Sequence, residues 1–259
     1  MINIDKNLFL QHADNITAIT SGAGSMGKTC IALSLAHALN TLKQSVMFFD
    51  ADNGIVNSAV QTGIQPEISL EQVVNGKKSL NQAITQINRK KFDMICGIPG
   101  SNVLETAPDG QLQIICDEMC ILAHNYDKFI IDLPADDKIM NHLLPKNTDL
   151  ILVCTNDQSN LVSTYQFLQK AATINKYKSL HIIVNHVNSY EEGLQAYNTL
   201  RRVCEQYIKV VPPLLGVVRR DTRIREAIRN QMLLLNCFAN SEAAEDIMQI
   251  ARKLLDKGK

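Results

Sequence analysis

Residues 16–29 have the sequence ITAITSGAGSMGKT, in which a short apolar stretch is followed directly by a glycine-rich turn. The eight positions from Gly22 to Thr29 fit the pattern G-x-x-x-x-G-K-T without a gap. Glycines let such a turn fold tightly and point its N–H groups at phosphate oxygens, and the start of the next helix adds a partial positive charge. This stretch therefore predicts a strand, a phosphate-binding loop and a helix in succession.

Lys28 and Thr29 give the loop its chemical character. A lysine at this position reaches the β- and γ-phosphates of a nucleotide, and the threonine hydroxyl ligates Mg²⁺. The three glycines also satisfy the dinucleotide pattern G-x-G-x-x-G, and Asp50 and Asp52 lie near the distance at which an acid would bind a ribose. A nicotinamide site has no use for Lys28 or Thr29, so we favour a nucleoside triphosphate over this alternative.

Around the loop, short β-branched apolar runs alternate with amphipathic segments. The predicted strands cover residues 16–20, 46–49, 94–98, 129–131, 150–154, 180–184 and 214–218, and the main helices cover residues 28–42, 161–172, 190–207 and 241–259. Nearly continuous hydrophobicity is typical of strands buried on both faces, and alternation with helices indicates a mainly parallel sheet. We predict an α/β fold: a single doubly wound domain over residues 1–259, with helices on both faces and a short N-terminal lead over residues 1–15.

The composition narrows the class of protein. With 46% hydrophobic residues and 26 basic against 26 acidic side chains, the chain is not of the disordered type. Zero net charge argues against bulk electrostatic binding to DNA. No apolar run approaches the roughly 18–20 residues of a membrane span, and the first residues do not resemble a secretion signal. We expect a cytoplasmic protein.

Carboxylates follow two of the predicted strands. Asp50 and Asp52 come after the second predicted strand, and Asp132 comes after the fourth. An apolar strand that delivers an aspartate beside a phosphate loop is typical of the acid that organises Mg²⁺ in P-loop nucleotidases. The alternative for Asp132 is a helix cap, a role that suits Asp136 better. The sequence therefore predicts Asp132 as a metal-site residue.

Together these segments resemble the MinD/ParA family of deviant Walker A ATPases. The loop, the pattern D-A-D-x-G-x-x-N over residues 50–57 and the pattern D-x-P-A over residues 132–135 match in order and spacing. Residues 215–227 are similar to that family's strand and helix beside the base. Within the family the chain most resembles the FlhG (FleN) branch, which limits flagellar number and position. Val56 stands where MinD proper usually has Arg, and residues 53–54 stand where ParA proteins usually have Pro-Gln.

The resemblance implies an activity and a set of site residues. Lys28 and Asp52 would be catalytic, Lys28 at the phosphates and Asp52 positioning the attacking water. Asp132 would hold the metal through water, Asp50 would support the adjoining switch, and Asn185 would contact adenine. The residues that bind ATP would be Gly22, Gly24, Ser25, Met26, Gly27, Lys28, Thr29, Cys30 and Asn185, and those at the Mg²⁺ site would be Thr29, Asp50 and Asp132. The family hydrolyses ATP slowly as a face-to-face homodimer that ATP favours and hydrolysis releases.

The chain departs from the family within the loop. Ala23 stands where the family has its signature lysine, which reaches the partner's phosphate in the dimer. An alanine cannot supply such a positive charge, which is worth about 10³–10⁵ in rate in related nucleotidases. Ser25 and Cys30 also replace usual residues, and Arg219 replaces a usual proline near the base. We therefore expect ATP–Mg²⁺ binding with weak hydrolysis, or another cation, such as Arg219 or Arg220, in place of the lysine.

Residues 241–259 form a predicted C-terminal amphipathic helix that Ser241 can cap. Its apolar stripe consists of Ala244, Ile247, Met248, Ala251, Leu254 and Leu255. We favour packing of this stripe on the sheet, because it lacks the large aromatic residues of interfacial helices. The alternative, implied by the family, is weak ATP-dependent contact with the inner face of the cell membrane.

Five arginines gather near the predicted nucleotide end of the last strand. They are Arg219, Arg220, Arg223, Arg225 and Arg229. Glu226 can pair with Arg223 or Arg229 at helical spacing, which favours a solvated helix face. The alternative is a surface for an acidic partner or for DNA phosphate.

Three functions fit these residues. The first is a dimerising ATPase that controls flagellar number, acting with flagellar regulators such as FlhF or FleQ-like proteins or with flagellar switch proteins. The second is an ATP-binding regulator that does not cycle. The third is a MinD- or ParA-like ATPase that positions division machinery or cargo. Ala23 favours the second function, whereas Asp52 and Asp132 favour the first.

Overall fold

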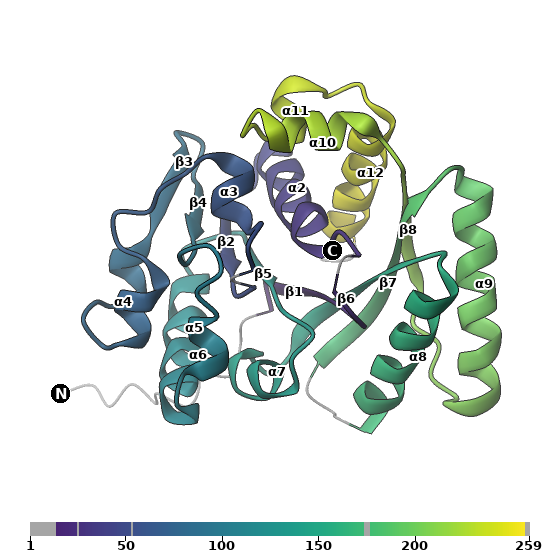
Figure 1. Ribbon diagram of the computed structural model, residues 1–259, viewed down its shortest axis with the longest axis horizontal. Coiled ribbons are helices and arrows are strands. Elements are labelled where there is room, and N and C mark those ends of the chain that lie inside the picture. The colour runs from purple at the N-terminus through teal and green to yellow at the C-terminus, as the bar shows by residue number, and fades with distance from the viewer. Residues whose placement is uncertain (1–13, 25, 53, 174–176, 257–259) are drawn as a thin grey trace.

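The computed structural model describes residues 14–24, 26–52, 54–173 and 177–256. One eight-stranded sheet runs through the molecule in the order β3-β4-β2-β5-β1-β6-β7-β8 (Figure 1). Neighbouring strands are parallel except β3 and β4, which are antiparallel. The strands are β1 (Ile16–Ser21), β2 (Val46–Asp50), β3 (Thr85–Asn88), β4 (Phe92–Ile95), β5 (Lys128–Asp132), β6 (Thr148–Thr155), β7 (Tyr177–Val187) and β8 (Leu214–Arg219). The predicted α/β fold with a mainly parallel sheet is confirmed.

Helices cover both faces of the sheet, as Figure 1 shows. One face carries α2 (Lys28–Thr41), α3 (Ser58–Thr62), α10 (Thr222–Arg229), α11 (Leu234–Cys237) and α12 (Glu242–Asp256). The other carries α4 (Leu70–Val74), the 3₁₀ helix η1 (Leu80–Ala83), α5 (Val103–Thr106), α6 (Asp109–Ala123), α7 (Asp137–Leu143), α8 (Gln158–Thr173) and α9 (Tyr190–Tyr207). Within the described residues, no helix is both long and apolar enough to cross a bilayer.

Strand β5 shows why the predicted strands are hydrophobic along their whole length. Phe129 and Ile131 pack into the core on the α6 side of the sheet, whereas Ile130 packs into the core on the α2 side. All three side chains are fully buried. Because alternate side chains enter two separate cores, an apolar residue is needed at every position of the strand.

The β3–β4 edge differs from the prediction. The predicted strand over residues 94–98 is β4, which begins at Phe92 and ends at Ile95. The chain leaves the sheet there because side chains satisfy its backbone: Asn57 donates to the Gly97 carbonyl, and Glu71 accepts from the Ile98 N–H. Strand β3 was not predicted, since its sequence TQIN is short and partly exposed. Among the described strands it pairs with β4 alone, at the sheet edge.

The strand order decides where a ligand can bind. Strand β1 lies between β5 and β6, at the point where successive connections diverge to the two sides of the sheet. Asp50 at the end of β2 is in register with Asp132 at the end of β5, and Asp132 is in register with Ile19 of β1. Ligands of such sheets bind beyond the carboxyl ends of the strands at this switch point. The predicted loop and carboxylates therefore converge there.

Helix α12 packs into the core instead of standing free. Its N-terminus is capped by the Ser241 hydroxyl, which accepts from the Ala244 N–H at 3.3 Å. Ala244, Ile247 and Ala251 of the predicted stripe are buried, together with Ile250. Met248, Leu254 and Leu255 are partly buried against the same core. The arrangement agrees with the core-packing interpretation, because the stripe that a membrane would need is already covered. Residues 257–259, the end of the predicted helix, lie outside the described residues.

Candidate functional site

The phosphate loop depends on two glycines for different reasons. A Cβ atom at Gly22 would lie 2.5 Å from the backbone of Ser163 in α8, so no larger residue fits between loop and helix. Gly27 has φ +77°, a left-handed conformation that glycine adopts without strain, and it immediately precedes α2. The first N–H groups of α2 lack partners within the helix and face the loop. Ser25, a predicted ligand of the nucleotide, lies outside the described residues.

Asn185, two residues before the end of β7, holds the loop in place. Its side-chain amide donates to the Met26 carbonyl at 2.9 Å, and a Cβ atom at Gly27 would lie 2.6 Å from the same nitrogen. The Asn185 side chain is buried, and its Oδ1 has no hydrogen-bond partner among the described residues. The structure thus places Asn185 against the phosphate loop, with an acceptor that a donor on a ligand can satisfy.

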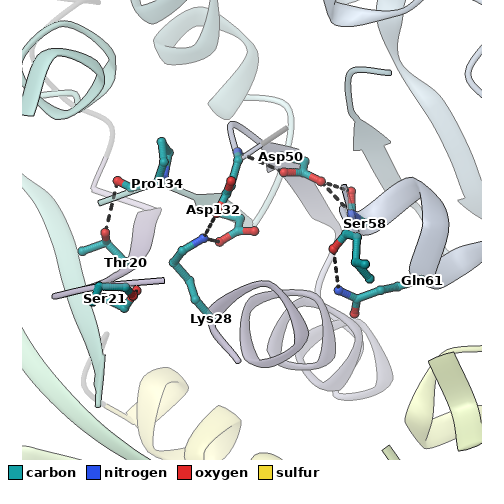
Figure 2. A network of polar contacts seen from close by, with 11 residues as sticks. Thr20, Ser21, Lys28, Asp50, Ser58, Gln61, Asp132 and Pro134 are labelled. Carbon is teal, nitrogen blue, oxygen red and sulfur yellow. Dashed lines mark hydrogen bonds and ion pairs between the residues drawn. The ribbon is translucent and has the colours of Figure 1, made fainter. Parts of the chain in front are cut away.

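Lys28 lies between two carboxylates (Figure 2). Its ammonium group forms ion pairs with Asp52 and, at 3.0 Å, with Oδ1 of Asp132. Burial lowers the pKa of Lys28, but the charges of Asp132 and Asp52 outweigh burial, so the pKa lies above its ordinary value. The lysine is therefore charged at neutral pH, and its charge is neutralised inside the protein.

Asp132 is fully buried at the end of β5. Burial raises its pKa, although Lys28 and the nearby Thr29 hydroxyl oppose the rise. Its second oxygen, Oδ2, has no hydrogen-bond partner among the described residues. Asp132 does not cap α7; that role belongs to Asp136, whose side chain accepts from the Ile139 N–H at 2.8 Å.

Asp50 contacts a residue that sequence reasoning missed. One oxygen of its carboxylate accepts from the backbone N–H of Ser58 at 2.8 Å and from the Ser58 hydroxyl (Figure 2). The other oxygen accepts from the Asp52 N–H at 3.1 Å. Burial and the charge of Asp132 raise the pKa of Asp50 to about 7. Both carboxylate oxygens already have donors, so this geometry suits the support of α3 better than metal ligation. A serine next to the cap residue Asn57 was the available signal in the sequence.

His186 is a second residue that the sequence did not indicate. It follows Asn185 where the pairing of β7 with β8 shifts register, and its φ of +61° is unusual for a residue other than glycine. This backbone turns the imidazole toward Gly27, where a Cβ atom would lie 3.5 Å from Nε2. Burial, Arg220 and Arg225 lower the pKa of His186. Local sequence carries no signal for this conformation, which arises from the irregular strand pairing.

The residues that depart from the family pattern have distinct surroundings. Ala23 and Cys30 are partly buried against the α2-side core, and burial raises the pKa of the Cys30 thiol to about 11. Arg219, one candidate for a substitute cation, binds Asp246 through Nε at 2.9 Å and also pairs with Glu242. These contacts hold the Arg219 side chain, at the end of β8, against α12. Arg223 pairs with Glu226 at 2.8 Å, which fits the predicted solvated helix face.

ATP–Mg²⁺ fits the donors and acceptors of this site. The N–H groups at the start of α2 and the Lys28 ammonium suit phosphate oxygens. The Thr29 hydroxyl and the unpartnered Oδ2 of Asp132 are the hard oxygen atoms that Mg²⁺ or its bound water prefers. The unpartnered Oδ1 of Asn185 can accept from the amino group of adenine.

Known proteins resemble this chain in sequence and in fold. Antiactivator FleN of Pseudomonas aeruginosa is 23% identical over 96% of this chain and 89% of its own length. Flagellum site-determining protein YlxH of Helicobacter pylori is 27% identical over 93% of this chain and 81% of its own length. The structure of the septum site-determining protein MinD from Pyrococcus horikoshii, solved with Mg-ADP, has a TM-score of 0.76 at 24% identity and covers 94% of this chain and 97% of that one.

The sequence also matches a family model directly. Residues 17–235 match the CobQ/CobB/MinD/ParA nucleotide binding domain, a span that begins in β1 and extends into α11. The phosphate loop, the strand-end carboxylates and Asn185 all lie within it. The chain therefore belongs to the CobQ/CobB/MinD/ParA family of nucleotide-binding P-loop proteins.

Proposed function

We propose that this protein is an ATP-binding switch of the FlhG (FleN) type, which dimerises with ATP–Mg²⁺ and hydrolyses it slowly to regulate flagellar number or placement. The observation that carries this proposal is the position of Lys28, between Asp52 and Asp132 at the start of α2. A phosphate group in the loop would compete with both carboxylates for one ammonium group. Nucleotide binding would thus change the partners of Lys28 and release Asp52.

The two carboxylates would then serve different roles. Asp132 is fully buried, so it is suited to hold a fixed position near the metal. The Asp52 side chain is 33% exposed, so it can contact and orient a water molecule once Lys28 moves away. The bound Mg²⁺ would supply neutralisation of the charge that develops on the phosphate oxygens. Asp50, held by Ser58, would keep the chain after β2 in place while Asp52 moves.

A second function is favoured by Ala23. Ala23 carries no charge, and Arg219 is held by Asp246 and Glu242. The side chains at positions 23 and 219 therefore supply no mobile cation to the phosphates. The protein would then bind ATP and dimerise but turn over very slowly, and it would act as a regulator that awaits an activating partner. Phosphate release distinguishes the two functions, because both predict ATP binding.

Three measurements on the same protein test the proposal. Equilibrium dialysis with ATP–Mg²⁺ gives binding, phosphate release gives turnover, and sedimentation velocity with ATP or ADP gives the dimer. We expect Lys28→Ala to abolish binding, Asp52→Asn to retain binding while losing turnover, and the exposed control Lys78→Ala to behave as wild type. A wild-type chain that binds no ATP would refute both functions.

The flagellar role rests on the resemblance to the FlhG (FleN) branch and on the name of the flagellum site-determining protein YlxH, and it needs a test in cells. We expect deletion of the gene to change the number or placement of flagella, as counted by electron microscopy. Wild-type protein should restore the pattern, and Lys28→Ala should not. A deletion strain with normal flagella but misplaced division sites or cargo would favour the MinD- or ParA-like alternative.

A further inference from the structure

A second surface lies at the opposite end of the sheet from the nucleotide site. Strands β4, β2 and β5 are neighbours in the sheet, and three segments of chain lie at their amino ends. These are residues 43–45 before β2, residues 89–91 before β4 and residues 125–128 at the start of β5. We call them together the amino-end surface. The phosphate loop and the strand-end acids lie at the carboxyl ends, so the function proposed above makes no use of this surface.

Hydrogen bonds join the three segments to one another. The Val46 N–H donates to the Lys91 carbonyl at 2.9 Å, and the Lys128 N–H donates to the Ser45 carbonyl at 3.1 Å. The Asn40 side chain from α2 donates to one carbonyl in each of the first two segments, both at 2.9 Å. Strands β2 and β4 behind these segments are fully buried. The backbone that carries the surface side chains is therefore held in place.

The amino-end surface is strongly basic. Its three segments carry five basic residues and one acidic residue, namely Lys43, Arg89, Lys90, Lys91, Lys128 and Asp127. The whole chain has 26 basic and 26 acidic residues, so positive charge is concentrated here. Within the described part of the chain, none of the five basic side chains forms an ion pair. Their charges are therefore available to a partner.

Asp127 is a fixed part of this surface. Its carboxylate accepts from the N–H and from the hydroxyl of Ser45, both at 2.7 Å. These hydrogen bonds, together with the charges of Lys91 and Lys128, lower the pKa of Asp127, so it is ionised at neutral pH. Its charge offsets part of the positive charge at the start of β5. The surplus of positive charge therefore lies on the turns before β2 and β4.

Two of the lysines occupy positions where the backbone favours other residues. Lys43 has φ +68° and Lys91 has φ +56°, a left-handed conformation that Gly or Asn adopts at lower cost. In the phosphate loop and after α3, the comparable left-handed positions are Gly27 and Gly63. The turns at the amino ends do not need a lysine for their shape, which points to a role for its charge.

The surroundings favour a protein segment over nucleic acid. Single-stranded nucleic acid stacks its bases on exposed aromatic side chains. Tyr126, the aromatic residue of the three segments, is buried, and the Lys91 ammonium lies over its ring at 5.0 Å from the centroid. Proteins that bind duplex DNA tightly make about 6–10 phosphate contacts, more than this set of cations supplies.

An exposed apolar residue lies next to the cations. Ile121 on the last turn of α6 is 60% exposed. It precedes Asn125 by four residues, and the Asn125 carbonyl accepts from the Lys91 ammonium. The amino-end surface thus combines positive charge with an apolar side chain at its edge, which complements a peptide that carries both carboxylates and an apolar residue.

We propose that the amino-end surface is the docking site for an acidic segment of a partner protein, one that presents several Asp or Glu carboxylates beside a large apolar side chain. The carboxylates pair with the basic side chains of residues 43–45 and 89–91, and the apolar side chain covers Ile121. Complementary charge raises the rate of association as well as the affinity. Docking does not require ATP, because this surface and the nucleotide site lie at opposite ends of the sheet.

The test uses a phage-displayed library of random twelve-residue peptides, selected on the full-length nucleotide-free protein. We expect enriched peptides to be rich in Asp and Glu and to carry an aliphatic or aromatic residue. A synthetic enriched peptide, followed by fluorescence anisotropy, should bind about tenfold more weakly to Arg89→Glu/Lys90→Glu. The matched control Lys77→Glu/Lys78→Glu should bind as wild type, because it changes the net charge by the same amount elsewhere on the surface. All four positions are exposed, so both variants are expected to fold, and circular dichroism checks this.

Two further variants separate docking from folding. Asn adopts a left-handed backbone at low cost, so Lys43→Asn should keep or raise the free energy of unfolding. The same variant should weaken peptide binding by about two- to fivefold, because one exposed charge pair is lost. Ile121→Ser should also weaken binding, whereas Ile114→Ser, at a residue of α6 that is 51% exposed, should not.

Several outcomes would overturn the docking site. They are no enrichment, enrichment of basic or neutral peptides, and an equal loss of binding in the two charge-reversal variants, which would show that the peptide responds to net charge alone. A single-stranded oligonucleotide or anionic lipid vesicles that bind wild type more tightly than the peptide, and fail to bind Arg89→Glu/Lys90→Glu, would assign the surface to nucleic acid or to a membrane. Self-association that the same variant abolishes would assign it to a second copy of this chain.

Discussion

The Lys28 ammonium lies 3.0 Å from Oδ1 of Asp132, so the lysine that would bind phosphate is held by a buried carboxylate of the adjacent strand. Burial of a charge is costly unless it is paired, and each residue here compensates the other. A ligand phosphate must replace this ion pair. The pair therefore links the stability of the nucleotide-free protein to its function.

A double-mutant cycle measures the strength of this pair. We expect Lys28→Met to destabilise the nucleotide-free protein by up to about 3 kcal/mol, because it leaves Asp132 buried without a cation. The double variant Lys28→Met/Asp132→Asn should lose less than the sum of the single variants, with a coupling of roughly 0.5–3 kcal/mol in urea denaturation. The exposed pair Lys170–Asp137, at 2.8 Å, serves as control and should couple by less than about 1 kcal/mol. Equal couplings would contradict the role of burial.

Restoring a lysine at position 23 should increase turnover. We expect Ala23→Lys to raise the rate of phosphate release at least about tenfold when ATP–Mg²⁺ supports a dimer, since a cation at the phosphates stabilises the charge of the transition state. Ala23→Met, which adds length without charge, should leave the rate unchanged. Should both variants match wild type while still binding ATP, the missing lysine would not be what limits hydrolysis.

The Asp50–Ser58 contact predicts a pH-dependent stability. The pKa of Asp50 is about 7 in the folded protein and close to 3.8 when unfolded, so the folded state binds more protons between these values and its stability falls as the pH rises through them. The Ser58 hydroxyl favours the charged carboxylate, so Ser58→Ala raises the pKa further. We expect this variant to lose about 1–3 kcal/mol, and to lose more at pH 8.5 than at pH 5.5, in urea denaturation without nucleotide.

The control for this experiment is Ser34→Ala, another buried serine, which lies on α2 and forms no hydrogen bond with a carboxylate in the described structure. Its effect on stability should be equal at the two pH values. A Ser58→Ala effect that is also equal at both values would show that Asp50 does not titrate in this range.

Helix α12 should behave as part of the core. Ile250 is buried, and its side chain fills the space where a Cβ atom at Gly216 would lie 2.4 Å away. We therefore expect Ile250→Ala to cost about 2–5 kcal/mol in urea denaturation, whereas Arg252→Ala on the exposed side of the helix should cost little. Wild-type protein should not sediment with anionic lipid vesicles, either with or without ATP–Mg²⁺. Sedimentation that requires ATP and is lost in Lys28→Ala would restore the membrane alternative.

Much of the site could be predicted from sequence because it depends on short segments. The loop from Gly22 to Thr29 requires particular residue types at fixed spacing, and Asp50 and Asp132 follow strands whose hydrophobicity is visible in one dimension. Several partners of these groups come from distant parts of the chain. Ser58, only eight residues after Asp50, was missed because the spacing alone does not show that the chain turns back there. Strand β3 was missed because it pairs with β4 at the edge without an apolar run of its own.

The sequence by itself determined the α/β class, the phosphate loop and the order of the strand-end acids, since these follow from local spacing and from strands buried on both faces. Only the tertiary structure decided that Lys28 binds two carboxylates, that Arg219 is held by Asp246 on α12, and that the stripe of α12 is covered. Side-chain charges and apolar faces each have several complementary partners in a sequence of this length. The packing of the sheet selects one of them, because a buried charge or an apolar face is stable only against the neighbour that the fold brings to it.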